Sequence, residues 1–169
     1  MNAKRISLLA MLITIAVVGR IIFTFIPNVQ PMTTIIIIAS FLVSPMEAIV
    51  IAVLSTILSN LYLGMGPWAI WQVLIWAMIG LISGLLGRVH TKIPLPILVM
   101  YAGFCGLFYG FIMSIAMSFI MEMDFWVYYL AGLPFDMSHA IGNMVFFAIL
   151  YPVLFRLFKR KKVGLDRWM

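Results

Sequence analysis

The feature that most constrains this chain is the position of its positive charges along a mostly apolar sequence. Ten of the eleven Lys and Arg residues flank the apolar stretches: they lie before the first, between the fourth and fifth, and at or beyond the end of the last. They are Lys4, Arg5, Arg88, Lys92, Arg156, Lys159, Arg160, Lys161, Lys162 and Arg167. If every stretch crosses a membrane, these places share one side, which the positive-inside rule predicts to be cytoplasmic.

The amino-acid composition indicates whether this chain folds in water or in a lipid bilayer. The 169 residues are 65% hydrophobic and 9% charged, whereas soluble domains are only about half apolar. We therefore expect one integral-membrane domain over residues 1–169. The net charge of +6 is explained by basic flanks that meet anionic lipid headgroups, so no nucleic-acid partner is expected. Cys105 is the only cysteine, which excludes an intramolecular disulfide.

Six apolar segments predict an all-α bundle of six transmembrane helices with both termini cytoplasmic. Their expected bounds are residues 6–26, 31–44, 46–62, 67–87, 96–120 and 134–158. The first resembles a secretory signal but lacks a cleavage site, so we expect a retained helix. Crossing ~30 Å of hydrocarbon takes about 20 residues. The short second segment therefore predicts a stubby helix shielded by its neighbours, or irregular backbone covered by protein or water.

Arg20 is the one cation inside an apolar stretch and away from its ends, since Arg156 lies in the last turn of the sixth segment. A charge at that depth is costly, which makes a functional role the default hypothesis. The side chain either extends to the outer headgroups or faces the bundle interior. We expect the interior position, with Arg20 paired to Asp136 or contacting an anionic group of a ligand.

In the sixth segment Asp136, His139 and Asn143 follow at intervals of three and four residues. They therefore share an arc of about 60° on a helix. This stripe predicts either a hydrogen-bonded seam between helices or one wall of a polar pocket. No second inward-facing histidine accompanies His139, so no metal site is expected.

The fourth segment begins GPWAIWQVLIWAMIG, with Trp68, Trp71, Gln72 and Trp76 over an arc of about 140°. Indole rings around one amide suit a flat conjugated ligand. Trp76 lies deep enough to serve core packing instead.

The outer connections carry further polar and aromatic residues. The first, FIPNVQPM, holds Asn28 and Gln30 between prolines and predicts a lid or a tight turn with capping amides. Asn60 and Tyr62 end the third segment, and Tyr129 lies in the last outer connection, MEMDFWVYYLAGLP. The aromatic residues there form an interfacial belt, alone or together with a ligand site.

Small residues recur every four positions in two segments. They are Gly80 and Gly84 in the fourth segment, and Gly106, Gly110, Ser114 and Ser118 in the fifth. This spacing favours close approach of helix backbones in lipid, so we expect packing ridges.

Several catalytic motifs are absent from the sequence. There is no G-x-x-x-x-G-K-[ST], so this polypeptide is not expected to hydrolyse ATP through a P-loop. There is also no H-E-x-x-H and no G-x-S-x-G, which removes the commonest motif-based routes to hydrolase chemistry. No cofactor is expected.

The chain resembles the substrate-binding S components of energy-coupling factor (ECF) transporters. The likeness is carried by GRIIFTFIPNVQPMTTIIII, LSNLYLGMGPWAIWQVLIWAMIGLISG and YYLAGLPFDMSHAIGN. It implies a non-enzymatic subunit of the prokaryotic plasma membrane that binds a vitamin or related micronutrient at the outer face. It further implies toppling in the membrane on docking to a transmembrane coupling subunit, powered by two cytoplasmic ATPases.

The resemblance also suggests a docking face and a ligand class. The family's A-x-x-x-A pattern on the first helix corresponds here to Ala10 and Thr14, where the second position departs from alanine. Metal-ion members begin Met-His, whereas this chain begins MNAKR, so a vitamin is expected. A cobalamin-type corrinoid is the first expectation, followed by flavin or pantothenate. An intramembrane enzyme using Asp136 and His139, and a structural assembly subunit, remain alternatives.

Overall fold

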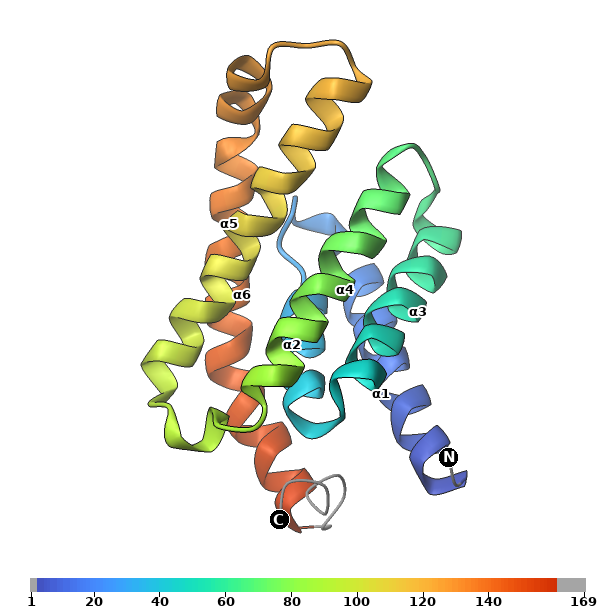
Figure 1. Cartoon of the computed structure of the whole chain (residues 1–169), viewed down its shortest axis with the longest axis vertical. Helices are drawn as coiled ribbons and strands as arrows, with labels where there is room; N and C mark the ends of the chain where they lie inside the picture. The colour runs from blue at the N-terminus through green and yellow to red at the C-terminus, as the bar shows by residue number, and fades with distance from the viewer. Residues whose placement is uncertain (1–2, 161–169) are drawn as a thin grey trace.

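A computed structural model of the chain describes residues 3–160 (Figure 1), and this part contains helices but no strand. Its elements are α1 Ala3–Ile22, η1 Phe23–Phe25, α2 Met32–Leu42, α3 Pro45–Leu63, α4 Trp68–Leu86, η2 His90–Lys92, α5 Leu95–Ile120 and α6 Phe125–Arg160. The basic residues Lys161, Lys162 and Arg167 lie outside the described residues.

Successive helices alternate in direction, so both ends of the described chain lie at one end of the bundle (Figure 1). The α2–α3 and α4–α5 connections share that end, which we call the inner end, following the orientation expected from the charges. The other three connections lie at the opposite, outer end. There α5 and α6 rise past the ends of α3 and α4.

Five helices in the described part are long and apolar enough to cross a membrane, whereas α2, with 11 residues, is a shorter apolar helix. All eleven residues of α2 are buried, and α2 packs against α1, α3, α4, α5 and α6. Of the two alternatives for this segment, the shielded stubby helix is therefore the one observed. Neighbouring helices, and not its own length, make α2 stable in the membrane.

The sixth helix begins nine residues earlier than expected, at Phe125 instead of residue 134. Asp124 starts it, because its Oδ1 accepts a hydrogen bond from the Val127 backbone N–H at 3.0 Å. Pro134, taken from the sequence as the end of a loop, lies inside the helix. Bundle neighbours make an internal proline tolerable in a membrane helix. The outer connection is therefore much shorter than MEMDFWVYYLAGLP.

The glycines of both predicted ridges lie at helix–helix contacts. A Cβ at Gly84 would come within 2.8 Å of the Pro45 Cα on α3, and one at Gly106 within 2.8 Å of the Ala140 Cα on α6. These distances are too short for any side chain, so the packing role of the glycine spacing is confirmed. Ser114 and Ser118 of the same ridge are also buried.

An ion pair joins α1 to α3 at the inner end. Arg5 donates from Nε to Glu47 Oε1 at 2.8 Å and from Nη2 to Oε2 at 2.6 Å. Glu47 also completes a capping box with Ser44 at the start of α3. One carboxylate thus both caps a helix and fixes its neighbour.

Candidate functional site

Arg20 lies inside the bundle near the outer end of α1, where only 7% of its surface is exposed. Its Nη1 donates to Ser59 Oγ at 2.6 Å and to Asn60 Oδ1 at 2.8 Å, both on α3. The guanidinium carbon also lies 5.0 Å from the centre of the Trp76 ring, a cation–π distance. The expected interior position of Arg20 is therefore observed, and extension to the headgroups is not.

The expected ion pair between Arg20 and Asp136 is absent from the described part of the chain, where the ion pair found is Arg5–Glu47. Arg20 turns toward neutral acceptors on α3. Asp136 instead packs on α5, where a Cβ at Gly110 would overlap its carboxyl group, and its Oδ2 is buried without a hydrogen bond. Arg20 consequently has no carboxylate partner among residues 3–160.

A chain of side-chain hydrogen bonds continues from Arg20 across the bundle. Asn60 donates from Nδ2 to Gln72 Oε1 at 2.8 Å. Gln72 then donates from Nε2 to the Tyr109 hydroxyl at 2.9 Å. Since these residues lie on α3, α4 and α5, the orientation of Arg20 depends on three neighbouring helices.

A second hydrogen-bonded chain runs beside the first. Trp76 Nε1 donates to Thr33 Oγ1 at 2.9 Å, and Thr33 lies 3.1 Å from His139 Nε2. His139 Nδ1 lies 3.0 Å from the backbone carbonyl of Asn28. Every contact is satisfied when Nδ1 carries the proton, because a carbonyl only accepts and Thr33 then donates to Nε2. The Trp76 ring packs at a tilt against Tyr109 with ring centres 4.8 Å apart, so the two hydrogen-bonded chains touch.

A cavity of about 190 Å³ opens above Arg20 at the outer end. The residues that line it come from α1, η1, the following loop and the end of α3: Arg20, Phe23, Thr24, Ile26, Asn28, Val29, Gln30 and Leu63. Asn28 has a left-handed φ of 58°, and its Nδ2 donates to the Phe135 carbonyl at 2.8 Å. The loop is thereby fastened to α6. Three predicted residues, Arg20, Asn28 and Gln30, meet in this cavity.

Other predicted residues lie elsewhere. Tyr62 and Trp68 are exposed, and Trp71 packs partly buried against the core. The Asn143 amide is fully buried without a hydrogen bond, and its Nδ2 lies 2.9 Å from where a Gly106 Cβ would be. The stripe of the sixth helix is therefore divided, because only His139 joins the hydrogen-bonded chains. Likewise, only Gln72 and Trp76 of the fourth helix belong to the hydrogen-bonded chains, and its three Trp residues do not form one continuous aromatic wall.

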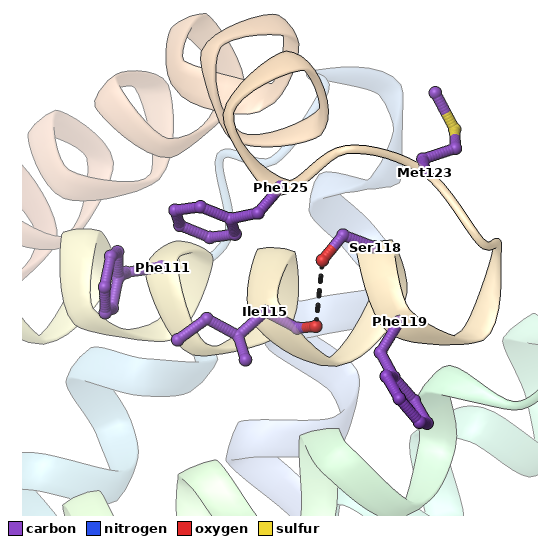
Figure 2. A pocket seen from close by; sticks show the side chains of 6 residues that line it. All are labelled: Phe111, Ile115, Ser118, Phe119, Met123 and Phe125. Carbon is purple, nitrogen blue, oxygen red and sulfur yellow. Dashed lines mark hydrogen bonds between the residues drawn. The ribbon is translucent and has the colours of Figure 1, made fainter.

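Tyr129 belongs to a separate aromatic region near the outer end of α5 and α6. Its ring stacks on Phe125 at 5.6 Å and meets Phe111 edge-on. An open apolar pocket of about 490 Å³ lies beside it (Figure 2). The side chains of Figure 2 come from α5, the turn after it and the first residue of α6: Phe111, Ile115, Ser118, Phe119, Met123 and Phe125. The Ser118 hydroxyl donates to the Ile115 carbonyl and so offers no free donor.

Ser59, Thr33 and Tyr109 belong to the site but were not among the residues predicted for it. Ser59 precedes Asn60, and Thr33 opens the apolar run of α2, so each was a polar residue in an apolar segment. Tyr109 lies between Gly106 and Gly110, where the packing signal masked it. A polar residue in an apolar segment is a signal that could have identified Ser59 and Thr33 from the sequence. Tyr109 could be identified only from the structure.

The expected docking residues lie on the outside of α1. Ala10 and Thr14 are both exposed, and the Thr14 hydroxyl donates to the Ala10 carbonyl at 2.8 Å. Within residues 3–160 no group of three or more His, Cys, Asp or Glu side chains is placed to hold a metal ion.

Comparison with known proteins places the chain in a family. The family described as ECF transporter, substrate-specific component, matches residues 4–158. Neither the curated proteins nor the solved structures compared with the chain give a match. The match covers nearly all of the described helices, from the start of α1 to the end of α6. The chain therefore belongs to the substrate-specific components of ECF transporters, a family of membrane-embedded transporter subunits.

Proposed function

We propose that this protein is the vitamin- or micronutrient-binding subunit of an ECF-type importer in a prokaryotic plasma membrane, and that the cavity above Arg20 receives the substrate. The observation that carries this proposal is a buried guanidinium that borders a cavity at the outer end and has no carboxylate partner in the described chain. The energy source is external: a coupling subunit and two cytoplasmic ATPases. Docking then topples the subunit to deliver its substrate inward.

Arg20 selects an anionic or strongly accepting group of the substrate. A guanidinium has five N–H donors, and the two hydrogen bonds of Arg20 to α3 both come from Nη1. Ser59 and Asn60 are neutral, so they orient the side chain without cancelling its charge. A carboxylate or phosphate in the cavity would gain charge-assisted hydrogen bonds in a site of low dielectric.

The cavity volume ranks the expected vitamins by how far the loop over the cavity must move. Ligand pockets usually measure about 300–1,000 Å³, whereas this cavity measures about 190 Å³. Pantothenate, a small carboxylate, requires the least movement and flavin requires more. A corrinoid requires residues 23–31 to release Phe135 and His139. Such a large ligand would also extend to the exposed predicted residues of the same end, Tyr62 and Trp68.

The docking face of the proposed importer subunit is the exposed surface of α1 around Ala10 and Thr14. Their small side chains allow a partner helix to approach closely. The Thr14 hydroxyl is already hydrogen-bonded within its own helix, so its burial against a partner leaves no polar group unsatisfied.

The test combines ligand identification with two substitutions. Purified protein in detergent is analysed by mass spectrometry for co-purifying small molecules, then titrated with pantothenate, riboflavin and hydroxocobalamin while its melting temperature is measured. Arg20→Ala should weaken binding by about tenfold to a hundredfold, the loss of a charged hydrogen bond worth ~1.5–3 kcal/mol. The control is Glu122→Gln, which removes an exposed charge in the turn between α5 and α6 at the same end.

A wild-type protein that co-purifies with no small molecule and melts at the same temperature with every added vitamin would overturn the proposal. Equal affinity of wild type and Arg20→Ala would remove Arg20 from the site. An enzyme that uses Asp136 and His139 as a pair has no support from the geometry, because both His139 ring nitrogens contact Thr33 and Asn28. No observation favours a purely structural subunit.

A further inference from the structure

An apolar groove separates α1 from α6 at the inner end of the bundle. It encloses about 400 Å³. Leu8, Met11 and Ile15 line it from α1, and Leu154 and Phe158 line it from α6. Leu8 and Phe158 are almost fully buried, whereas Met11 and Ile15 are exposed. The groove thus has a closed floor and an open side, away from the cavity above Arg20.

Polarity changes along this groove in one direction. Its polar lining residues are Lys4 and Ser7, both in the first two turns of α1, and Ile15 lies eleven residues beyond Lys4. Eleven residues of helix measure ~16 Å. That length is about half of the ~30 Å hydrocarbon core. The groove therefore extends through one leaflet, with its cation at the membrane surface and its apolar walls directed toward the midplane.

Among the described residues, none that lines the groove cancels the charge of Lys4. Within residues 3–160 no carboxylate lines the groove, and the ion pair found there belongs to the neighbouring Arg5, which binds Glu47. A ligand that matches the groove therefore carries a negative group at one end and an extended apolar chain behind it.

We propose that this groove binds an anionic phospholipid of the leaflet at the inner end, with its phosphate at Lys4 and one acyl chain along Met11 and Ile15. A phospholipid has its charge and its chain in the same order as the groove. A helix of a second copy would fill the apolar part but would not neutralise Lys4. This lipid site is separate from substrate binding and does not depend on it.

Native mass spectrometry of the full chain tests the proposal. Delipidated protein is titrated with phosphatidylglycerol, or with phosphatidylcholine that has the same acyl chains. Wild type should bind phosphatidylglycerol about fivefold more tightly, which corresponds to the ~1 kcal/mol that a basic residue contributes near an anionic surface. Lys4→Gln should remove this preference and retain binding of phosphatidylcholine. Met11→Trp should weaken both lipids by filling the groove.

Lys92→Gln is the matched control, since Lys92 is an exposed cation at the same end outside the groove. It should leave the preference unchanged. The proposal fails if wild type does not distinguish the two lipids, or if Lys92→Gln lowers the preference as much as Lys4→Gln. It also fails if Met11→Trp binds phosphatidylglycerol like wild type, or if the protein forms dimers that exclude lipid. Melting temperatures of the three variants verify that each is folded.

Discussion

At the scale of single residues, the main feature is that Arg20 is buried in the bundle without a negatively charged partner among the described residues. An uncompensated charge in hydrocarbon is expensive. Arg20 offsets part of that cost with neutral acceptors on Ser59 and Asn60 and with the face of the Trp76 ring. Because none of these partners is anionic, the positive charge remains available to a ligand.

Replacing Gln72 by Leu should destabilise this arrangement. The change leaves Asn60 without its acceptor and Tyr109 without its donor. Unsatisfied buried groups and lost interhelical bonds predict a cost of about 1–3 kcal/mol, measured as a lower melting temperature in detergent. Ser138→Ala is the control, since it removes one exposed hydrogen bond to the Pro134 carbonyl. Equal melting temperatures for wild type and Gln72→Leu would show that this chain of hydrogen bonds does not stabilise the bundle.

His90, at the inner connection, predicts a pH dependence of stability. Burial lowers the pKa of His90, and its hydrogen bond to the Gly87 carbonyl only partly opposes this effect. The unfolded chain then binds more protons once the pH falls through about 6.5. The stabilisation that comes from a neutral His90 is therefore fully present above that pH and is lost progressively below it.

His90→Phe isolates this effect, since the imidazole stacks on Phe41 with ring centres 4.8 Å apart and a phenyl ring keeps that packing. The melting temperature of wild type should fall more between pH 8 and pH 5.5 than that of the variant. Parallel pH profiles would show that the imidazole does not titrate on unfolding.

At the scale of elements, the pair α5 and α6 shows how small residues place polar groups inside a membrane protein. Gly106 and Gly110 allow the backbone of α6 to approach α5, and the side chains of Asp136 and Asn143 occupy the space where Cβ atoms would be. The predicted stripe on α6 is thus a packed seam over most of its length. Only His139 turns toward α2 and the outer loop.

Gly110→Ala should disturb this seam, because its Cβ would overlap the Asp136 carboxyl group. Overpacking typically costs about 1–3 kcal/mol. Gly132→Ala on α6 is the control, since the nearest atom to its Cβ is Ser114 Oγ at 3.9 Å; that variant should be neutral or slightly stabilised. Adding Asp136→Ala to Gly110→Ala should restore part of the lost melting temperature. Strictly additive effects of the two changes would argue against the contact.

At the scale of the whole molecule, the arrangement of the ends leads to a proposal about orientation. The basic residues Lys4, Arg88, Lys92 and Arg156 belong to the start of α1, the α4–α5 connection and the last turns of α6. These parts of the chain form the inner end, so we propose that this end is cytoplasmic. The cavity above Arg20 then opens outside, as uptake requires. The great length of α6, 36 residues or ~54 Å, exceeds the hydrocarbon thickness, so part of it projects into water or headgroups.

Thiol labelling tests this orientation. Cys105 is buried and is first replaced by Ser to give a cysteine-free background. Glu122→Cys, at the outer turn, should react with a membrane-impermeant maleimide in intact cells. Lys92→Cys, at the inner connection, should react only after the membrane is permeabilised. The reverse labelling pattern would invert the proposed topology and place the cavity on the cytoplasmic side.

The sequence by itself determined the solvent, the helical class, five of the six helices to within a few residues at most boundaries, and the interior position of Arg20. These follow from apolar length, charge position and the cost of a buried cation, all of which are local. The predicted start of the sixth helix at residue 134 was wrong, because the packing around a proline decides whether a helix continues through it.

Only the tertiary structure decided which polar residues meet. Helix periodicity places Asp136, His139 and Asn143 on one face, but it does not say which helix that face touches. Packing assigned Asp136 and Asn143 to the glycines of α5 and assigned His139 to Thr33 and the Asn28 carbonyl. Hydrogen bonds between helices depend on distances across the bundle, which no spacing along the chain contains. For that reason the partners of Arg20 on α3 were not predictable, and these neutral partners leave its charge without a carboxylate among the described residues.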